Sequence, residues 1–195
     1  MDKKTFIFIG ISGSGKGTQA KLLIDYFKKN FPGESIFYNE TGSLFREFVS
    51  KDNYSSSLAK KILDEGGREP DFLAVWLWSD FLINNLKGNE YLIIDGTPRS
   101  LNEAEIFDNA LGFYNRKATV LYVNIDRDEA VKRLIKRGRG DDKEISDIEK
   151  RLDWFEKDVL PAIDYYKTNS DCNFIEIDGE GSVEEVQRRI NEKIF

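Results

Sequence analysis

The 195-residue sequence contains no histidine and a single cysteine, Cys172. Catalysis by a histidine general base or by a Ser-His-Asp triad is therefore excluded. A zinc site built from cysteine and histidine is excluded as well, because one cysteine cannot supply the ligands. No disulfide can close within the chain, which favours a reducing compartment. We expect Cys172 to be an inert thiol, since nothing near it in sequence suggests activation of a thiolate.

Long apolar runs and an excess of positive charge are also missing. The longest apolar stretch, Phe72–Trp78, is far too short to span a bilayer. Lys and Arg number 29 and Asp and Glu number 35, so the net charge is −6. An acidic chain is a poor general binder of nucleic acid, because such binding neutralises many phosphates. With no signal-peptide pattern at its start, we expect a cytoplasmic protein without membrane or nucleic-acid partners.

Short apolar runs alternate with helical patterns along the whole chain. The runs are Phe6–Ile9, Ser35–Tyr38, Tyr91–Ile94, Thr119–Ile125 and Asn173–Ile177. The first run shows no polar alternation, which is typical of a strand buried on both faces. Strands that alternate with helices form βαβ units and a mostly parallel sheet. The sequence therefore predicts an α/β fold with a central parallel sheet of five strands.

Two intervals are longer than one crossover helix requires. Residues 41–86 have several helical patterns and predict a helical insertion. The aromatic residues of this interval are expected to pack within the insertion rather than to form a base-stacking surface; they are Phe72, Trp76, Trp78 and Phe81. Residues 137–142 are rich in glycine and charge and predict a hinge. Pro161 should kink or divide the helix that begins near Glu144.

A glycine-rich loop joins the first predicted strand to a helix over Lys16–Asn30. Its sequence, Gly10-Ile11-Ser12-Gly13-Ser14-Gly15-Lys16, has the spacing GxxxxGK of a phosphate-binding loop. Backbone N–H groups of such a loop form an anion site at a helix N-terminus, and Lys16 adds a charge for the β- and γ-phosphates. The predicted nucleotide-binding residues are Gly10, Ser12, Gly13, Ser14, Gly15, Lys16, Gly17 and Thr18.

One position of this loop departs from the usual pattern. Gly17 follows the lysine where Ser or Thr normally stands, and Thr18 comes one place later. The hydroxyl that usually binds Mg²⁺ is therefore missing from its normal position. Magnesium would be held more by phosphates and water, which its reluctance to dehydrate allows.

The run Gly-Lys-Gly-Thr-Gln resembles the phosphate loop of adenylate kinases and related nucleoside monophosphate kinases. Further segments resemble the same family in the same order along almost the whole chain: 41–46 (T-G-D-L-L-R in the family), 95–99 (D-G-F-P-R), the lid and following helix at 137–142 and 150–152, and the C-terminal parts at 161–166 and 178–183. Each segment is weak alone, whereas the ordered set is highly specific.

The resemblance implies a donor site for ATP. Lys16 and the loop amides would hold the ATP phosphates. Arg133 would stack on the ATP base, with the loop around Gly179 close to that base. Arg137, Arg139 and Arg151 would surround the transferring phosphoryl group, and together with Lys16 and Arg99 they form the predicted catalytic set.

The resemblance also implies an acceptor site. Thr41, Arg46, Gly96 and Arg99 would hold the acceptor nucleotide, with the two arginines clamping its phosphate. Asp95 would orient water bound to magnesium. The acceptor phosphate is mostly ionised at neutral pH because its second pKa is about 6, so the reaction needs no general base.

The acceptor base is less well determined. Where adenylate kinases carry a glutamine that reads adenine, this chain has Glu103. A carboxylate only accepts hydrogen bonds, so it suits a base edge with two donors, such as that of guanine. Arg68-Glu69-Pro70 also departs from the family's apolar pair before this proline. Both differences predict relaxed or altered acceptor specificity.

The sequence and the resemblance thus predict one P-loop kinase domain over residues 1–195. It has the helical insertion at 41–86 and, as the resemblance implies, a short lid at 137–143. The expected reaction is Mg²⁺-dependent transfer from ATP to AMP, giving two ADP, by a monomer that binds small nucleotides. One alternative is the same reaction with GMP, UMP, CMP or a deoxynucleotide as acceptor. Others are a P-loop kinase for a different small acceptor and a nucleotide-binding sensor without kinase activity.

Overall fold

The computed structural model describes residues 4–138, 144–168 and 170–195. Within these residues the strands form one parallel sheet in the order β2-β3-β1-β4-β5. The strands are β1 (Lys4–Ile9), β2 (Ile36–Glu40), β3 (Tyr91–Asp95), β4 (Lys117–Asn124) and β5 (Asn173–Asp178). The predicted α/β class with a parallel five-stranded sheet is confirmed, and β2 is shifted towards the C-terminus relative to its predicted position.

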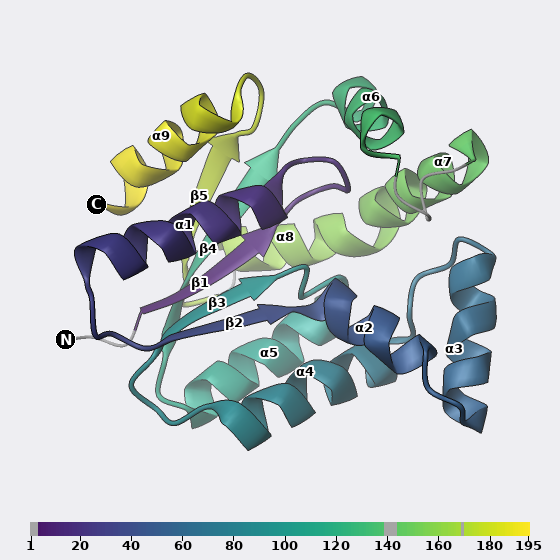
Figure 1. Ribbon diagram of the computed structural model, residues 1–195, viewed down its shortest axis with the longest axis horizontal. Helices are drawn as coiled ribbons and strands as arrows, with labels where there is room; N and C mark the ends of the chain where they lie inside the picture. The colour runs from purple at the N-terminus through teal and green to yellow at the C-terminus, as the bar shows by residue number, and fades with distance from the viewer. Residues whose placement is uncertain (1–3, 139–143, 169) are drawn as a thin grey trace.

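Helices cover both faces of this sheet (Figure 1). They are α1 (Lys16–Asn30), α2 (Thr41–Val49), α3 (Tyr54–Asp64), α4 (Asp71–Asn85), α5 (Leu101–Phe113), α6 (Arg127–Arg137), α7 (Ile145–Trp154), the π-helix η2 (Phe155–Val159), α8 (Leu160–Thr168) and α9 (Val183–Ile194). Helices α1 and α9 pack on one face, and α4, α5 and α8 lie on the other. None of the helices in the described residues is long and apolar enough to cross a membrane.

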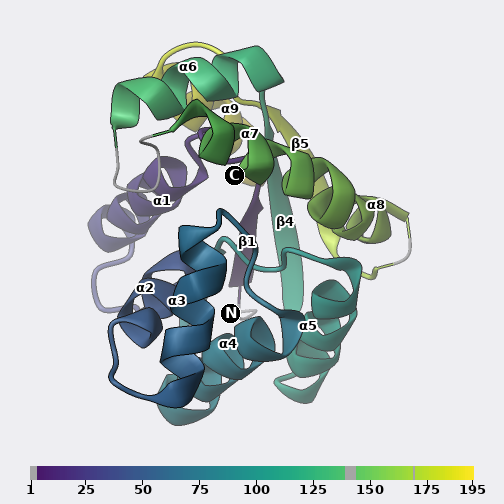
Figure 2. The same cartoon turned by 90° about the vertical axis from the view of Figure 1, so that its right-hand side faces the viewer.

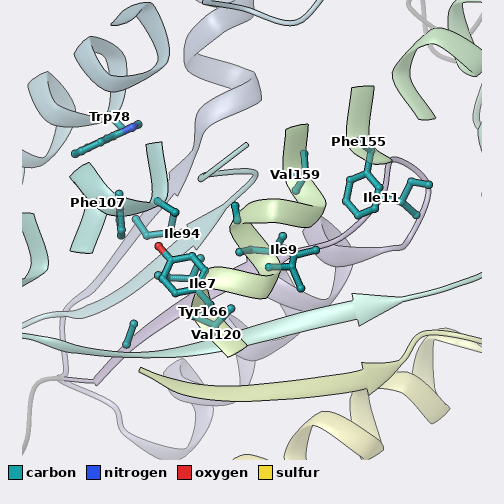
Figure 3. Close-up of a cluster of buried hydrophobic side chains, with 14 of the residues drawn as sticks. Ile7, Ile9, Ile11, Trp78, Ile94, Phe107, Val120, Phe155, Val159 and Tyr166 are labelled. Atoms are coloured by element: carbon teal, nitrogen blue, oxygen red, sulfur yellow. The ribbon is translucent and has the colours of Figure 1, made fainter. Parts of the chain in front are cut away.

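Strand β1 shows why its sequence lacks polar alternation. Phe6 and Phe8 pack into the cluster beneath α1 and α9. Ile7 and Ile9 point the other way, into the larger cluster that includes Phe107 of α5 (Figure 3). Because both faces of the strand are covered, both sets of side chains are apolar.

The interval 41–86, predicted to be a helical insertion, contains α2, α3 and α4. Its own small core contains Phe45, Phe48, Ala59, Leu73 and Leu77. The second half of α4 instead belongs to the main core, where Trp78 stacks edge-on against Phe107 of α5. The first half of α4 therefore packs in the small core and its second half packs in the main core.

The expectation that the aromatic residues of the insertion pack within it is wrong for Phe72, which is 73% exposed. Trp76 is 46% exposed but packs edge-on against Phe48 of the small core, and Trp78 is fully buried. Helical spacing explains the difference, since Trp78 shares the inner face of α4 with Leu77 and Leu82 while Phe72 lies on the opposite side.

The long helical segment after residue 144 is divided, as its proline predicts. Helix α7 passes into η2, and α8 begins one residue before Pro161. Proline has no N–H to donate and its ring clashes with the carbonyl four residues earlier, so regular α-helical bonding is interrupted there. The predicted lid lies mostly outside the described residues, which include only Arg137 and Gly138 of it.

Candidate functional site

A cleft with a volume of about 640 Å³ opens at the carboxyl ends of β1 and β3. This is the edge at which open α/β sheets bind ligands, and the volume lies in the range of small-molecule sites. Helices α6 and α7 stand on one side of this edge and α2 and α3 on the other (Figure 2). We call the side of α6 and α7 the donor half and the side of α2 and α3 the acceptor half.

The phosphate loop forms the floor of the cleft. Gly15 precedes α1 in the left-handed region, with φ of +88°, and Lys16 begins the helix. Only glycine takes this conformation without strain. The loop residues that line the cleft are Gly10, Ser12, Gly13, Gly15, Lys16, Gly17 and Thr18. Ser14 is buried behind them, so its contribution to the cleft is limited to the loop backbone.

Packing explains why Gly17 replaces the usual hydroxyl residue. A Cβ atom at this position would lie 2.8 Å from Oδ2 of Asp95. The first turn of α1 is therefore in close contact with the end of β3. The carboxylate of Asp95 takes the space that a Ser or Thr side chain would need.

Asp95 has the features of a ligand-binding carboxylate. It lines the cleft although only 6% of the residue is exposed. Its Oδ2 accepts a hydrogen bond of 3.2 Å from the Tyr38 hydroxyl, while Oδ1 is buried and has no hydrogen-bond partner among the residues that the structure describes. Burial raises the pKa of Asp95, and the charge of Lys16 opposes this shift. An unpaired carboxylate oxygen beside a phosphate loop suits the water shell of Mg²⁺.

Two arginines converge in the acceptor half. A Cβ atom placed on Gly42 would lie 3.2 Å from Nη1 of Arg46 and 3.4 Å from Nη2 of Arg99. Arg46 comes from α2, whereas Arg99 comes from the loop between β3 and α5. Both residues line the cleft. The absence of a side chain at Gly42 leaves space between two guanidinium groups, which together can bind a phosphate.

Each of these arginines has a carboxylate partner that also lines the cleft. Nη2 of Arg46 lies 2.8 Å from Oε1 of Glu40, in a pair whose side chains are 45% and 30% exposed. Nη1 of Arg99 donates to Glu69, whose side chain is only 4% exposed. The roles of Glu40 and Glu69 were not predicted. The departure of residues 68–70 from the family pattern is the signal that points to Glu69.

Glu103 does not face the cleft, which corrects the prediction that it reads the acceptor base. It is fully buried in α5. Oε1 accepts hydrogen bonds of 3.1 Å from Trp78 Nε1 and from Thr97 Oγ1, and Oε2 accepts one of 2.6 Å from the backbone N–H of Arg99. Burial raises the pKa of Glu103 to about 7. With both oxygens engaged by the protein, Glu103 supports the acceptor loop from behind.

Thr41 is also turned away from the cleft, contrary to the expected contact with the acceptor. It is fully buried, and its hydroxyl lies 2.7 Å from the Thr97 hydroxyl and 3.2 Å from Oδ1 of Asn39. Thr97 in turn donates to Glu103. This buried polar network joins the end of β2 to the loop after β3, because Thr41 contacts both Asn39 of β2 and Thr97 of that loop. Gly96 of that loop does line the cleft.

The donor half brings together most of the predicted ATP-binding residues. Arg133 and Arg137 of α6 and Arg151 of α7 line the cleft. Nη1 of Arg133 donates to the carbonyl of Gly179 at 3.1 Å, and its Nε donates to Glu129 at 2.8 Å. Gly179 itself is not among the described residues that line the cleft. Arg139, predicted to contact the transferring phosphoryl group, lies outside the described residues.

Trp154 is a further lining residue that the sequence did not indicate. It ends α7, and its ring lies 6.0 Å from the Arg99 guanidinium carbon, within the range of a cation–π interaction. Phe155 and Val159 of η2 continue the lining beside it. Trp154 therefore connects the segment that carries Arg151 to the acceptor arginine across the cleft.

Comparison with known proteins agrees with this geometry. The family described as Adenylate kinase matches residues 8–171. An adenylate kinase of Leptospira biflexa is 34% identical over 196 residues, which cover 98% of this chain and 100% of the relative. Adenylate kinases of Synechococcus and of Azobacteroides pseudotrichonymphae are 33% and 29% identical, covering 96% and 95% of this chain and 97% and 94% of theirs. The chain therefore belongs to the adenylate kinase family of phosphotransferases, whose acceptor is a phosphate group.

Proposed function

We propose that this protein catalyses reversible, Mg²⁺-dependent transfer of a phosphoryl group from ATP to AMP, giving two ADP. The observation that carries this proposal is the pair of anion sites in one cleft. The phosphate loop with Lys16 forms the first, and Arg46 and Arg99 converge above Gly42 to form the second. A neutral acceptor would not require the second site. A nucleotide sensor would not require it either, because it binds a single nucleotide.

The residues divide into groups with separate tasks. Lys16 and the loop amides hold the donor phosphates, and Arg133 lies beside the donor base. Arg137, Arg139 and Arg151 neutralise charge on the transferring group, while Arg46 and Arg99 hold the acceptor phosphate. Phosphoryl transfer depends mainly on such positioning and charge neutralisation. Magnesium, when bound, neutralises phosphate charge and orients the donor, and Asp95 would hold its water shell.

Closure of the cleft belongs to the same proposal. Residues 137–143 would act as a short lid over the insertion at 41–86, and closing would exclude water that could otherwise hydrolyse ATP. Gly138 ends α6 with φ of +58°, a conformation that lets the chain leave the helix sharply. We further propose a monomer that works on free nucleotides in the cytoplasm.

The test is an acceptor panel assayed with ATP and Mg²⁺ by coupled detection of ADP. AMP should give the highest kcat/KM among AMP, GMP, UMP, CMP and the deoxynucleotides. A higher value for another monophosphate would keep the reaction and change the acceptor. ADP formation without any monophosphate acceptor, or no ADP at all, would contradict the kinase. The burial of Glu103 removes the argument that this residue selects guanine.

A further inference from the structure

Glu69 is an unusual residue for an anion-binding cleft. It lies in the segment between α3 and α4, beside Pro70, and its side chain is 4% exposed. Lys, Glu, Arg and Asp are almost never this buried unless they are paired. Its partner is Arg99, one of the two arginines that converge above Gly42. A buried negative charge therefore lies next to the proposed acceptor-phosphate site.

The hydrogen bonds of Arg99 show what Glu69 does to the guanidinium group. Nε donates to the carbonyl of Gly96 at 2.7 Å, and Nη1 donates to Glu69. Nη2 is the nitrogen that lies near Gly42, on the side where Arg46 approaches. The bonds to Gly96 and Glu69 together hold the guanidinium with Nη2 near Gly42. Glu69 also occupies one of the donor nitrogens that a bidentate phosphate contact would use.

The charge of Glu69 acts on its surroundings as well. Its carboxylate adds to the upward pKa shift of Glu103, which is caused mainly by burial. Charge interactions weaken slowly with distance where water is excluded. An acceptor phosphate with two negative charges would be attracted by Arg99 and repelled by Glu69. In the more exposed pair of Arg46 with Glu40, the arginine would likewise attract the phosphate and the glutamate would repel it.

We propose that Glu69 limits the affinity of this enzyme for the acceptor phosphate. It engages one nitrogen of Arg99 and opposes the charge of the ligand, while the bond from Nε to Gly96 holds the guanidinium in place. The proposal rests on the function proposed above. It concerns the acceptor half alone, so the affinity for ATP is independent of Glu69.

Two neutral variants of different shape test whether the charge of Glu69 is responsible. In Glu69→Gln and Glu69→Val, the KM for AMP should fall by about three- to tenfold, the effect of removing one nearby like charge. The kcat should change less than the KM for AMP, and the KM for ATP should not change. Glu65→Gln is the matched control, because Glu65 is exposed and lies outside the cleft lining. Titration with AMP alone should show the same gain in affinity.

The outcomes separate this inference from the proposed function. A lower KM for AMP in both neutral variants supports the inference, whereas an unchanged or higher KM overturns it. A parallel change in the KM for ATP would overturn it too, because the effect would then be structural. Failure of the unmodified enzyme to transfer phosphate to any acceptor would overturn the proposed function, and the inference with it. Because Arg99 is 22% exposed, loss of Glu69 leaves it in contact with solvent and does not threaten folding.

Discussion

The two halves of the cleft differ in the charged side chains that line them. The donor half presents Lys16, Arg133, Arg137 and Arg151. Among the described residues that line the cleft, the carboxylates are Glu40, Glu69 and Asp95, and all belong to β2, β3 and the insertion.

This difference matches the charges of the proposed ligands. A triphosphate carries more negative charge than a monophosphate, whose second ionisation has a pKa of about 6. Carboxylates that line only the acceptor half would help to orient two nucleotides that share similar bases and riboses. Carboxylates in the acceptor half would disfavour the triphosphate there, which is specificity by repulsion.

The donor half gives the largest expected effect. Lys16→Met removes the charge aimed at the β- and γ-phosphates and should lower kcat by about a thousandfold or more. The helix should still form, since Lys16 is its first residue and Met is a good helix former. Steady-state kinetics and circular dichroism test both points. Lys28→Met, at the exposed end of α1, is the control, and near-normal turnover of Lys16→Met would refute the donor assignment.

Breaking the Arg99–Glu69 pair tests the acceptor half. Arg99→Ala should raise the KM for AMP by about a hundredfold and lower the free energy of unfolding by about 3 kcal/mol, because it leaves Glu69 buried without its partner. Arg46→Ala should also weaken AMP binding, yet it should cost less than about 1 kcal/mol of stability, because its pair is exposed. Equal losses in the free energy of unfolding for Arg99→Ala and Arg46→Ala, measured by urea unfolding, would contradict this contrast. Adding Glu69→Val to Arg99→Ala should recover stability but not AMP binding.

Asp95 lies between the halves and should show opposite effects on activity and stability. Asp95→Asn should lower kcat by about tenfold if the carboxylate holds magnesium-bound water. The raised pKa of Asp95 means that its charged form is disfavoured by folding, so the neutral amide should increase the free energy of unfolding at pH 7. Kinetics across a Mg²⁺ titration and urea unfolding are the measurements. Asp25→Asn, on the exposed side of α1, should change neither; a less stable Asp95→Asn would contradict the burial argument.

Glu103 gives the smallest expected effect on activity, but a clear dependence of stability on pH. Its pKa is raised from 4.5 to about 7, so the folded state binds a proton more tightly than the unfolded state. Stability from this group is therefore present below about pH 4.5 and is lost as pH rises through about 7, by roughly 3 kcal/mol in total. Urea unfolding from pH 5 to 8 should show a steeper fall for the unmodified protein than for Glu103→Gln. The exposed Glu105→Gln should keep the full slope.

Local sequence predicted most of the fold and the phosphate-loop residues that line the cleft. The apolar run of β1, the glycines of the phosphate loop and the start of α1 are adjacent in the chain, so their spacing alone indicates a phosphate-binding turn. Helical periodicity was less reliable for the aromatic residues of α4, because it shows which residues share a face but not which face is covered. Phe72 shows this limit, because it is exposed on a face of α4 that no other element of the described residues covers.

The acceptor site was less predictable from residues taken one at a time. A position in an ordered motif indicated Arg46 and Arg99 correctly as cleft residues, but it also placed Glu103 and Thr41 there. Their side chains turn inward because Thr97 and Trp78, from other segments, offer hydrogen bonds in the core. Hydrogen bonds from these donors offset the free-energy cost of burying the carboxylate.

The sequence by itself determined the class of the protein. Three features that indicate this class can be seen as patterns in the sequence. They are the phosphate loop, the order of strands and helices, and the order of the arginines. Only the tertiary structure decided the partners of the charged groups. Glu69 meets Arg99 across 30 residues, and Asp95 fills the space beside Gly17 from another strand. Whether a carboxylate faces a ligand or the core depends on which distant donors reach it, and folding alone brings those donors together.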